Sequence, residues 1–231
     1  INQLVTQPER GQTEDEFLAD QVSRARSRLI AADRIILSKG ITADLLEAGV
    51  RAKLDALRTL AMLDSQGLGR HFHPFIDALN EGDSDKFARM GRLSRFWFEV
   101  DKLAYSQVDG VDQLMAELKQ LLSDEQAGEA EFLAAQDASF VINNRGFQDE
   151  ATTVLRMIGD RFANDAKLGA EAQDLIEKTA FREKVIAAQS GNRSDVKALF
   201  LNIRELLQDP TKLTVETLDN TLNAAQVLEY N

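Results

Sequence analysis

The feature that most constrains the fold of this chain is an internal repeat of amphipathic segments. The stretch LMAELKQLLSD at residues 114–124 recurs as LFLNIRELLQD at residues 199–209, an offset of 85 residues (199 − 114). The matching apolar pairs are Leu114/Leu199, Leu118/Ile203, Leu121/Leu206 and Leu122/Leu207. The segments that follow align with one insertion, so that Ala138 matches Ala224. Two segments that repeat in the same order indicate a recurring structural unit.

The repeated segments have the apolar period of α-helices. Apolar residues recur at steps of three and four, whereas no segment alternates apolar and polar residues long enough to form a strand. Thr13 with Glu16 predicts a capping box, Gly40 ends that helix, and Thr42 begins the next, which ends at Gly67. Further helices are predicted at about 69–81, 84–107, 111–123, 129–144, 148–164, 167–189, 195–208 and 214–230. The sequence therefore predicts an all-α protein of about ten helices in antiparallel hairpins.

Helical hairpins that cannot bury their apolar faces alone stack on their neighbours. The predicted architecture is an α-solenoid of the tetratricopeptide or HEAT type, in one continuous domain. A loose lead-in covers residues 1–12, a first repeat unit residues 13–110, and a second unit residues 111–231, which we expect to end inside a further repeat. The predicted core includes Leu54, Leu57, Phe75, Leu118, Leu121, Leu155, Ile158, Phe162, Ile203 and Leu206.

Composition excludes several classes of function. The formal net charge is −11, and a nucleic-acid partner requires a basic face, so none is expected. Four basic residues lie close together in sequence, but helical spacing spreads them around the axis: Lys86, Arg89, Arg92 and Arg95. The chain has no cysteine, and it has no apolar run long enough to span a membrane. It also lacks a Gly-x-Ser-x-Gly motif and a Walker loop, and we expect no cofactor.

Four stretches resemble a known family: AADRIILSKG, AKLDALRTLAML, ARMGRLSRF and VLRMIGDRFAND. Together they are similar to the helical extension that precedes the thioredoxin-like domain in some secreted bacterial thiol–disulfide oxidoreductases. The resemblance runs from about Arg24 to Asn231 and rests on helix-packing patterns. It implies a periplasmic or secreted protein whose redox domain follows Asn231. That family's Cys-x-x-Cys motif has no counterpart here, so the resemblance assigns no catalytic residue to this chain.

His71 and His73, in the stretch GRHFHPF, are the candidate metal ligands. Two ligands on one helix should be four residues apart, whereas an i, i+2 pair points to nearly opposite sides. An extended backbone would bring both onto one face, and Pro74 favours such a backbone at His73. The apolar stripe of Phe72 and Phe75 instead favours a helix that begins near His73. The histidines are then expected to cap or flank that helix.

Trp97, the only tryptophan, stands in the stretch RFWF of a predicted helix. Phe96, Val100 and Leu103 fit one buried stripe of this helix, which leaves Trp97 or Phe98 on a neighbouring face. In a solenoid such a second face is usually the packing surface of the next repeat. The alternative is a partner-binding groove lined by Trp97 and Arg92, because tryptophan and arginine are enriched at interface hot spots.

The favoured hypothesis is a non-catalytic helical-repeat module that binds a protein or peptide, including its own missing C-terminal domain. The alternative is a metal-binding or enzymatic α-protein that uses His71, His73 and nearby carboxylates. A third hypothesis is a structural spacer without a ligand. The last predicted helix adds one surface, because Leu222 and Leu228 would remain partly exposed at the end of the solenoid. We expect a weak homodimer through that helix.

Overall fold

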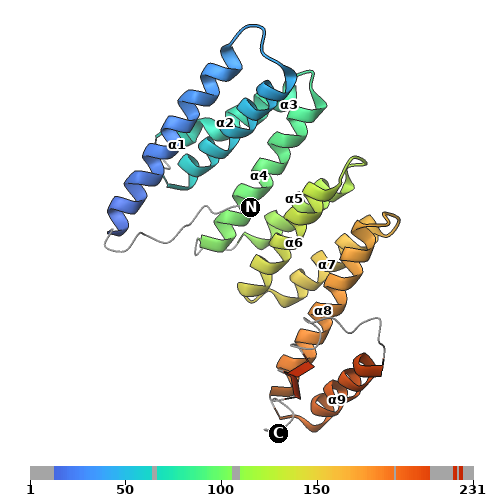
Figure 1. The fold of residues 1–231 in the computed structure, drawn as a ribbon. Coiled ribbons are helices and arrows are strands. Elements are labelled where there is room, and N and C mark those ends of the chain that lie inside the picture. The colour runs from blue at the N-terminus through green and yellow to red at the C-terminus, as the bar shows by residue number, and fades with distance from the viewer. Residues whose placement is uncertain are drawn as a thin grey trace. The chain divides into compact units, whose positions relative to one another are not determined.

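The computed structural model describes residues 13–63, 67–105, 110–189 and 191–208, together with residues 221, 222, 224 and 225. Within these residues the regular structure is helical, without a β-strand. The elements are α1 (Glu14–Leu37), α2 (Ala43–Leu63), the 3₁₀ turn η1 (Leu68–His71), α3 (Phe72–Glu81), α4 (Asp85–Tyr105), α5 (Val111–Ser123), α6 (Glu129–Asn144), α7 (Gln148–Phe162), α8 (Leu168–Gln189) and α9 (Arg193–Gln208) (Figure 1). The predicted all-α class is confirmed for this part of the chain. The searched helices include none that is long and apolar enough to cross a membrane.

The first two helices begin where the sequence predicts, and α1 ends at Leu37, three residues before the predicted stop at Gly40. Thr13 Oγ1 accepts a hydrogen bond from Glu16 N at 3.2 Å, and Thr13 N donates to Glu16 Oε2 at 2.9 Å, which completes the capping box. Gly40 has φ +71°, a left-handed conformation that glycine adopts without strain. Thr42 Oγ1 then accepts from Leu45 N at 3.3 Å at the start of α2.

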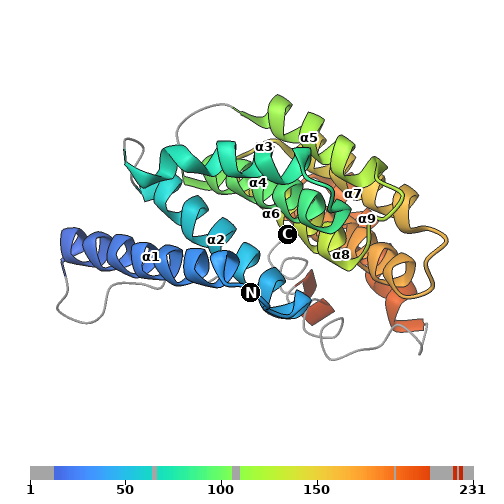
Figure 2. The same cartoon turned by 90° about the horizontal axis from the view of Figure 1, so that it is seen from above.

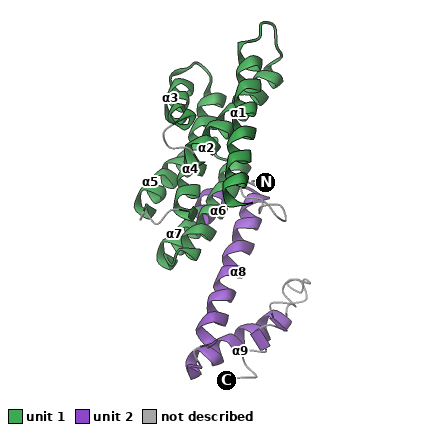
Figure 3. Cartoon of the chain, turned by 90° about the vertical axis from the view of Figure 1, so that its left-hand side faces the viewer, with its two compact units in different colours: residues 1–157 green, residues 158–231 purple. Residues whose placement is uncertain are grey.

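The chain forms two compact units, residues 1–157 (unit 1) and residues 158–231 (unit 2), coloured separately in Figure 3. The division falls within α7, after Met157. The repeat pattern predicts a boundary at residue 110, but unit 1 continues through that position. The compact units reflect which residues contact one another, whereas the predicted units reflect which stretches of sequence resemble one another. Their boundaries therefore fall at different residues.

Unit 1 begins with three helical hairpins, α1–α2, α3–α4 and α5–α6 (Figures 1 and 2). The two helices of each hairpin contact one another, and the second helices of successive hairpins also meet, α2 with α4 and α4 with α6. Helix α4 additionally contacts α5 of the next hairpin. It is therefore the central helix of unit 1, with neighbours from all three hairpins.

One core cluster of unit 1 lies between α1, α2, α3 and α4. Its buried members are Ala25, Leu29, Val50, Leu54, Ala56, Leu57, Leu60, Phe72, Ile76 and Phe98. The rings of Phe72 and Phe98 have centroids 5.1 Å apart. Gly69 allows η1 to approach α2 closely, because a Cβ atom at this position would lie 2.5 Å from the Ala61 Cα. Backbone contact of this kind leaves no room for a larger residue.

Most of the predicted core residues are buried. Leu54, Leu57, Leu118, Leu121, Leu155, Ile158, Phe162 and Ile203 are buried, as the helical period predicts. Phe75 and Leu206 are only partly buried and pack against the edges of their clusters. At Phe75 a polar neighbour takes part of the surface, because Lys53 Nζ lies 4.4 Å from the ring centroid. These two predicted core residues therefore lie at the edge of the core rather than inside it.

Unit 2 has a smaller described core. Helices α8 and α9 contact one another, and the buried cluster consists of Phe181, Ala188, Leu199, Ile203 and Ala224. Ala224, which falls in the last predicted helix, is fully buried in this cluster with Leu199 and Ile203. Most of that predicted helix, residues 214–230, lies outside the described residues. The α-solenoid arrangement of the repeats stays a prediction.

Candidate binding cleft

A cleft of about 420 Å³ opens in unit 1 where α2, α4 and α6 meet. Its apolar wall consists of Leu54, Met90, Leu93, Trp97 and Ala130. Its polar wall consists of Glu47, Arg51, Asp55, Arg58, Lys86, Arg89, Ser94 and Glu131. The volume lies within the range of ligand-binding pockets, and the mixture of apolar and charged walls is typical of binding sites. We refer to it as the α2–α4–α6 cleft.

Helix α4 sends its four basic residues to different neighbours. Residues three apart on a helix differ in direction by about 300°, so each step rotates the side chain by about 60° around the axis. The resulting partners are Lys86 with Glu47 of α2, Arg89 with Glu131 of α6, Arg92 with Asp124 at the end of α5, and Arg95 with Glu117 of α5. The spread that the sequence predicts is therefore present, and each of the four basic side chains lies beside a carboxylate.

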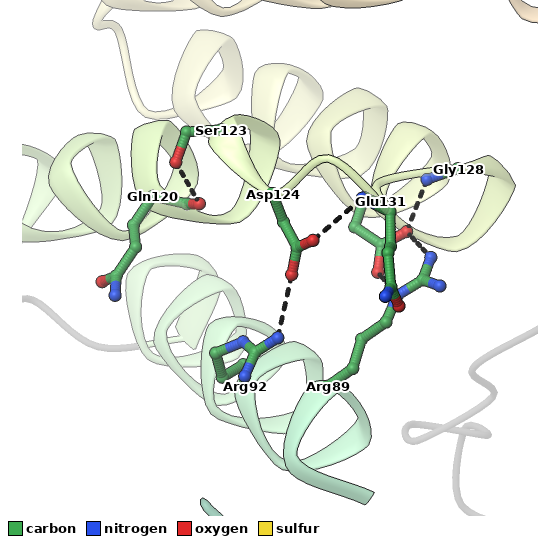
Figure 4. A network of polar contacts seen from close by, with 8 residues as sticks. Arg89, Arg92, Gln120, Ser123, Asp124, Gly128 and Glu131 are labelled. Atoms are coloured by element: carbon green, nitrogen blue, oxygen red, sulfur yellow. Dashed lines mark hydrogen bonds and ion pairs between the residues drawn. The ribbon is translucent and has the colours of Figure 1, made fainter. Parts of the chain in front are cut away.

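Arg89 and Glu131 join α4 to the first turn of α6 (Figure 4). Arg89 Nε donates to Glu131 Oε1 at 2.7 Å, and a second, very short contact joins Arg89 Nη2 to Glu131 Oε2. Glu131 Oε2 also accepts from Gly128 N at 2.9 Å, so this carboxylate caps α6 as well. Burial by itself would raise the pKa of Glu131, but the bonds from Arg89 and from backbone N–H groups hold it below its usual value.

A second ion pair, Arg92 with Asp124, fixes the loop between α5 and α6. Arg92 Nη2 donates to Asp124 Oδ2 at 2.9 Å, and Gln126 N donates to Asp124 Oδ1 at 2.9 Å (Figure 4). The Gln126 N–H, together with Arg92, lowers the pKa of Asp124. Two arginines one turn apart on α4 therefore hold the two ends of the same loop.

Three enclosed polar atoms of the described residues lack a hydrogen-bond partner, and all three lie on α2 and α4: Arg58 Nε, Ser94 Oγ and Asp101 Oδ2. Arg58 is 3% exposed, and its Nε lies 3.6 Å from Asp101 Oδ2, which is longer than a hydrogen bond. Burial raises the pKa of Asp101 and that of Asp55, although the charge of Arg58 opposes both shifts. Arg58 and Ser94 line the cleft, so unused hydrogen-bonding capacity lies in its wall.

The structure places Trp97 and Arg92 in different clefts. Trp97 is half-buried and lines the α2–α4–α6 cleft. Arg92 lines a smaller cleft of about 230 Å³ with Arg95, Glu117 and residues of α3 and α5. Five residues of helix rotate the side chain by about 140°, which explains why one groove does not contain both. Neither predicted alternative describes Trp97 fully, because it is neither in the core nor beside Arg92.

The histidines lie at the junction of η1 and α3. His71 is the last residue of η1, and its side chain makes no capping hydrogen bond. His73 stands in the first turn of α3, where its ring meets Phe98 edge-on at a centroid distance of 5.4 Å. Burial, and next the charge of Arg95, lower the pKa of His73. The searched residues contain no group of three or more His, Cys, Asp or Glu that could hold a metal ion. The two histidines flank the helix start, as the apolar stripe predicts.

The surface predicted at Leu222 and Leu228 belongs to unit 2. Leu222 is 61% exposed, whereas Ala224 two residues later is fully buried. Leu228 lies outside the described residues. The neighbouring helix α9 also exposes large apolar side chains, Phe200 at 55% and Leu207 at 49%. Leu207 was matched by sequence to the buried Leu122, so the repeat pairing does not extend to the burial of this position.

The comparisons with known proteins assign no family. No family model matches the chain, and neither a curated protein nor a solved structure is significantly similar to it. The functional interpretation therefore rests on the cleft itself.

Sequence reasoning missed the central residues of this cleft, Arg58 and Ser94. A signal for Arg58 is present in the sequence, because it interrupts the buried run from Ala56 to Leu60 on α2. A charged residue within an apolar stripe requires a partner or a ligand. Ser94 carries no comparable signal, since serine is frequent on both faces of helices.

Proposed function

We propose that this chain is a non-catalytic helical-repeat module that binds a segment of a partner protein in the α2–α4–α6 cleft. The observation that carries the proposal is that the half-buried Trp97 and the enclosed Arg58 line the same cleft of about 420 Å³. Tryptophan and arginine in a partly desolvated pocket are the residues that dominate binding energy in protein interfaces.

The packing of unit 1 supports the repeat part of the proposal. The second helices of three hairpins adjoin in the order α2, α4, α6, which is how stacked hairpins build a continuous surface. Matched positions of the sequence repeat also agree in burial at Leu114/Leu199, Leu118/Ile203 and Ala138/Ala224. A surface that crosses several hairpins suits an extended segment better than a compact metabolite.

Two of the three carboxylates in the polar wall are held in a way that favours binding over catalysis. Glu47 accepts from both Arg51 and Lys86, and the Lys86 hydrogen bond is the largest influence that lowers its pKa. Glu131 is held by Arg89 and Gly128. Carboxylates held in this way are poor general bases, because their basicity is reduced. Their role in the cleft is to position the basic side chains of its wall.

The resemblance to helical extensions of secreted thioredoxin-like proteins suggests a setting for this activity. We propose that the module belongs to an exported thiol–disulfide oxidoreductase. Its cleft would bind a segment of a partner protein or of its own redox domain. The parent reading frame tests this setting. A downstream Cys-x-x-Cys within a βαβ pattern supports it, and a downstream region of another kind contradicts it.

Selection of peptides from a random library on the purified protein tests the binding function. Trp97→Ala should weaken the binding of the selected peptides by about 30-fold, which corresponds to about 2 kcal/mol of binding free energy for a hot-spot residue. Tyr105→Ala is the matched control, because Tyr105 is an aromatic residue on the same helix but is 66% exposed and outside the cleft. Equal losses in both variants, or no selected peptide, would contradict the proposal.

A weak homodimer through the last helix is a second proposal, favoured by the exposure of Leu222. Replacing Leu222 and Leu228 together by glutamate should abolish concentration-dependent association in sedimentation equilibrium. Leu37→Glu is the control, because Leu37 is 81% exposed at the end of α1. A strict monomer, or association that survives the double replacement, would exclude this surface.

A further inference from the structure

The α2–α4–α6 cleft reverses the charge balance of the chain. The whole sequence has 38 acidic and 27 basic residues. Among the residues that line the cleft, the basic side chains Arg51, Arg58, Lys86 and Arg89 outnumber the carboxylates Glu47, Asp55 and Glu131. A local excess of basic groups in an acidic protein is an electrostatic feature that selects partners by charge.

Two of the three carboxylates in the wall are already used by basic neighbours. Glu47 is shared between Arg51 and Lys86, and Glu131 is held by Arg89 and Gly128. The third, Asp55, is ionised less readily than an exposed aspartate because burial raises its pKa. Arg51 and Lys86 remain 66% and 64% exposed although both are paired with Glu47. Donors are thus in surplus over acceptors along the cleft.

Arg58 adds an unsatisfied donor inside the wall. Its side chain is 3% exposed, and its Nε has no hydrogen-bond partner. Ser94, 7% exposed on the facing helix, also has an unpartnered hydroxyl. Asp101 Oδ2 lies 3.6 Å from Arg58 Nε, so this charge has a neighbouring carboxylate but no hydrogen bond through Nε. A buried polar group without a hydrogen bond is costly, and a carboxylate that enters the cleft would supply a further acceptor to its wall.

We propose that the segment bound in this cleft is acidic, with its aspartate or glutamate side chains bound by Arg58, Arg51 and Lys86 and an apolar side chain against Trp97. This inference rests on the proposed function, because it names the chemistry of the bound segment. Side-chain carboxylates fit better than a chain terminus. The basic residues come from two helices, α2 and α4, and from different depths of the wall, whereas a terminus offers one carboxylate.

The test uses four pools of short peptides on the whole chain. Three are acetylated and amidated and carry Asp/Glu, Asn/Gln or Lys/Arg at the same fixed positions. The fourth is the Asn/Gln pool with a free C-terminal carboxylate. Trp97 emission is a direct readout of the cleft, because Trp97 is the only tryptophan. Anisotropy of labelled peptides provides an independent measurement. The acidic pool should bind roughly ten-fold tighter than the other three.

Variants locate the preference within the cleft. Arg58→Met should remove most of the preference for the acidic pool. Arg51→Ala with Lys86→Ala, two exposed positions that leave the core intact, should reduce it by several-fold. Arg24→Ala is the matched control, because it removes an exposed arginine of an i, i+4 ion pair on α1, with 68% side-chain exposure. If Arg58→Met does not fold, the double variant decides the question.

The outcomes separate the two proposals. If no pool binds, both the binding function and the acidic ligand are wrong. If the pools bind equally, or the free terminus or the basic pool binds best, while Trp97→Ala still weakens them, only the acidic ligand is wrong. A preference for the acidic pool that survives in the double variant and in Arg58→Met would also overturn the inference.

Discussion

Unit 1 and unit 2 are both helical, but different interactions stabilise their helix packing. In unit 1 an aromatic and aliphatic core is accompanied by ion pairs that join different helices, among them Arg89–Glu131 and Arg92–Asp124. In unit 2 two of the five buried residues in the cluster of α8 and α9 are alanines, the ion pair Lys178–Asp174 lies within α8, and α9 exposes Phe200 and Leu207. The comparison teaches that apolar stripes bring helices together in both units, whereas in unit 1 ion pairs between different helices accompany that packing.

The largest expected difference concerns core truncation. Leu57→Ala in unit 1 and Leu199→Ala in unit 2 both remove a buried leucine. Each replacement should lower the unfolding free energy by about 2–5 kcal/mol. The loss should be larger for Leu57, because Leu57 belongs to the larger cluster, where more neighbours surround the cavity. Urea unfolding, monitored by circular dichroism, measures both values. A larger cost at Leu199 would reverse the comparison.

Removal of a charged partner should also affect unit 1 more. Arg89→Ala leaves the Glu131 carboxylate, 1% exposed, without its guanidinium partner, and should cost about 3 kcal/mol of unfolding free energy. Lys178→Ala removes a partner of the exposed pair in unit 2 and should cost less than about 1 kcal/mol. Similar costs in thermal and urea unfolding would show that the pair between α4 and α6 contributes no more than a surface pair.

The close approach of η1 to α2 provides a smaller test within unit 1. Gly69→Ala places a Cβ against the backbone of Ala61, which cannot move aside as a flexible side chain could. Overpacking of this kind should cost about 1–3 kcal/mol. Gly110→Ala is the control, because no atom lies within 4 Å of its added Cβ. Equal stability of the two variants would show that η1 moves away from α2 freely.

The smallest expected effect is the pH dependence at Asp55. Its folded-state pKa is raised mainly by burial, so its contribution to stability is fully present below the unfolded-state pKa and is lost as the pH rises through the folded-state pKa. Asp55→Asn should therefore be slightly more stable than the unmodified chain at neutral pH. The difference should shrink as the pH approaches about 4, the ordinary range for aspartate. A difference that grows towards acid pH would contradict the raised pKa.

The sequence predicts much of this fold because local signals determine its helices. The capping box at Thr13, the left-handed Gly40 and the stripes of Leu54 and Leu57 are each visible in a short window. The cleft is not local. Arg89 and Glu131 are 42 residues apart in sequence, and no pattern within either helix identifies the other as its partner. The sequence predicts that Trp97 lies outside the buried stripe of its helix, but only the packing of α2 against α4 brings Arg58 into the same cleft.

Hydrogen–deuterium exchange with and without a peptide selected on the whole chain tests the binding function most directly. It reports on unit 1 and unit 2 in the same experiment. If the α2–α4–α6 cleft is the binding site, exchange should slow in α2, in α4 and in the first turn of α6, while α9 and the segment around Leu222 remain unchanged. Protection confined to α9 and the segment around Leu222, with α2 and α4 unaffected, would contradict the proposed function and assign binding to unit 2.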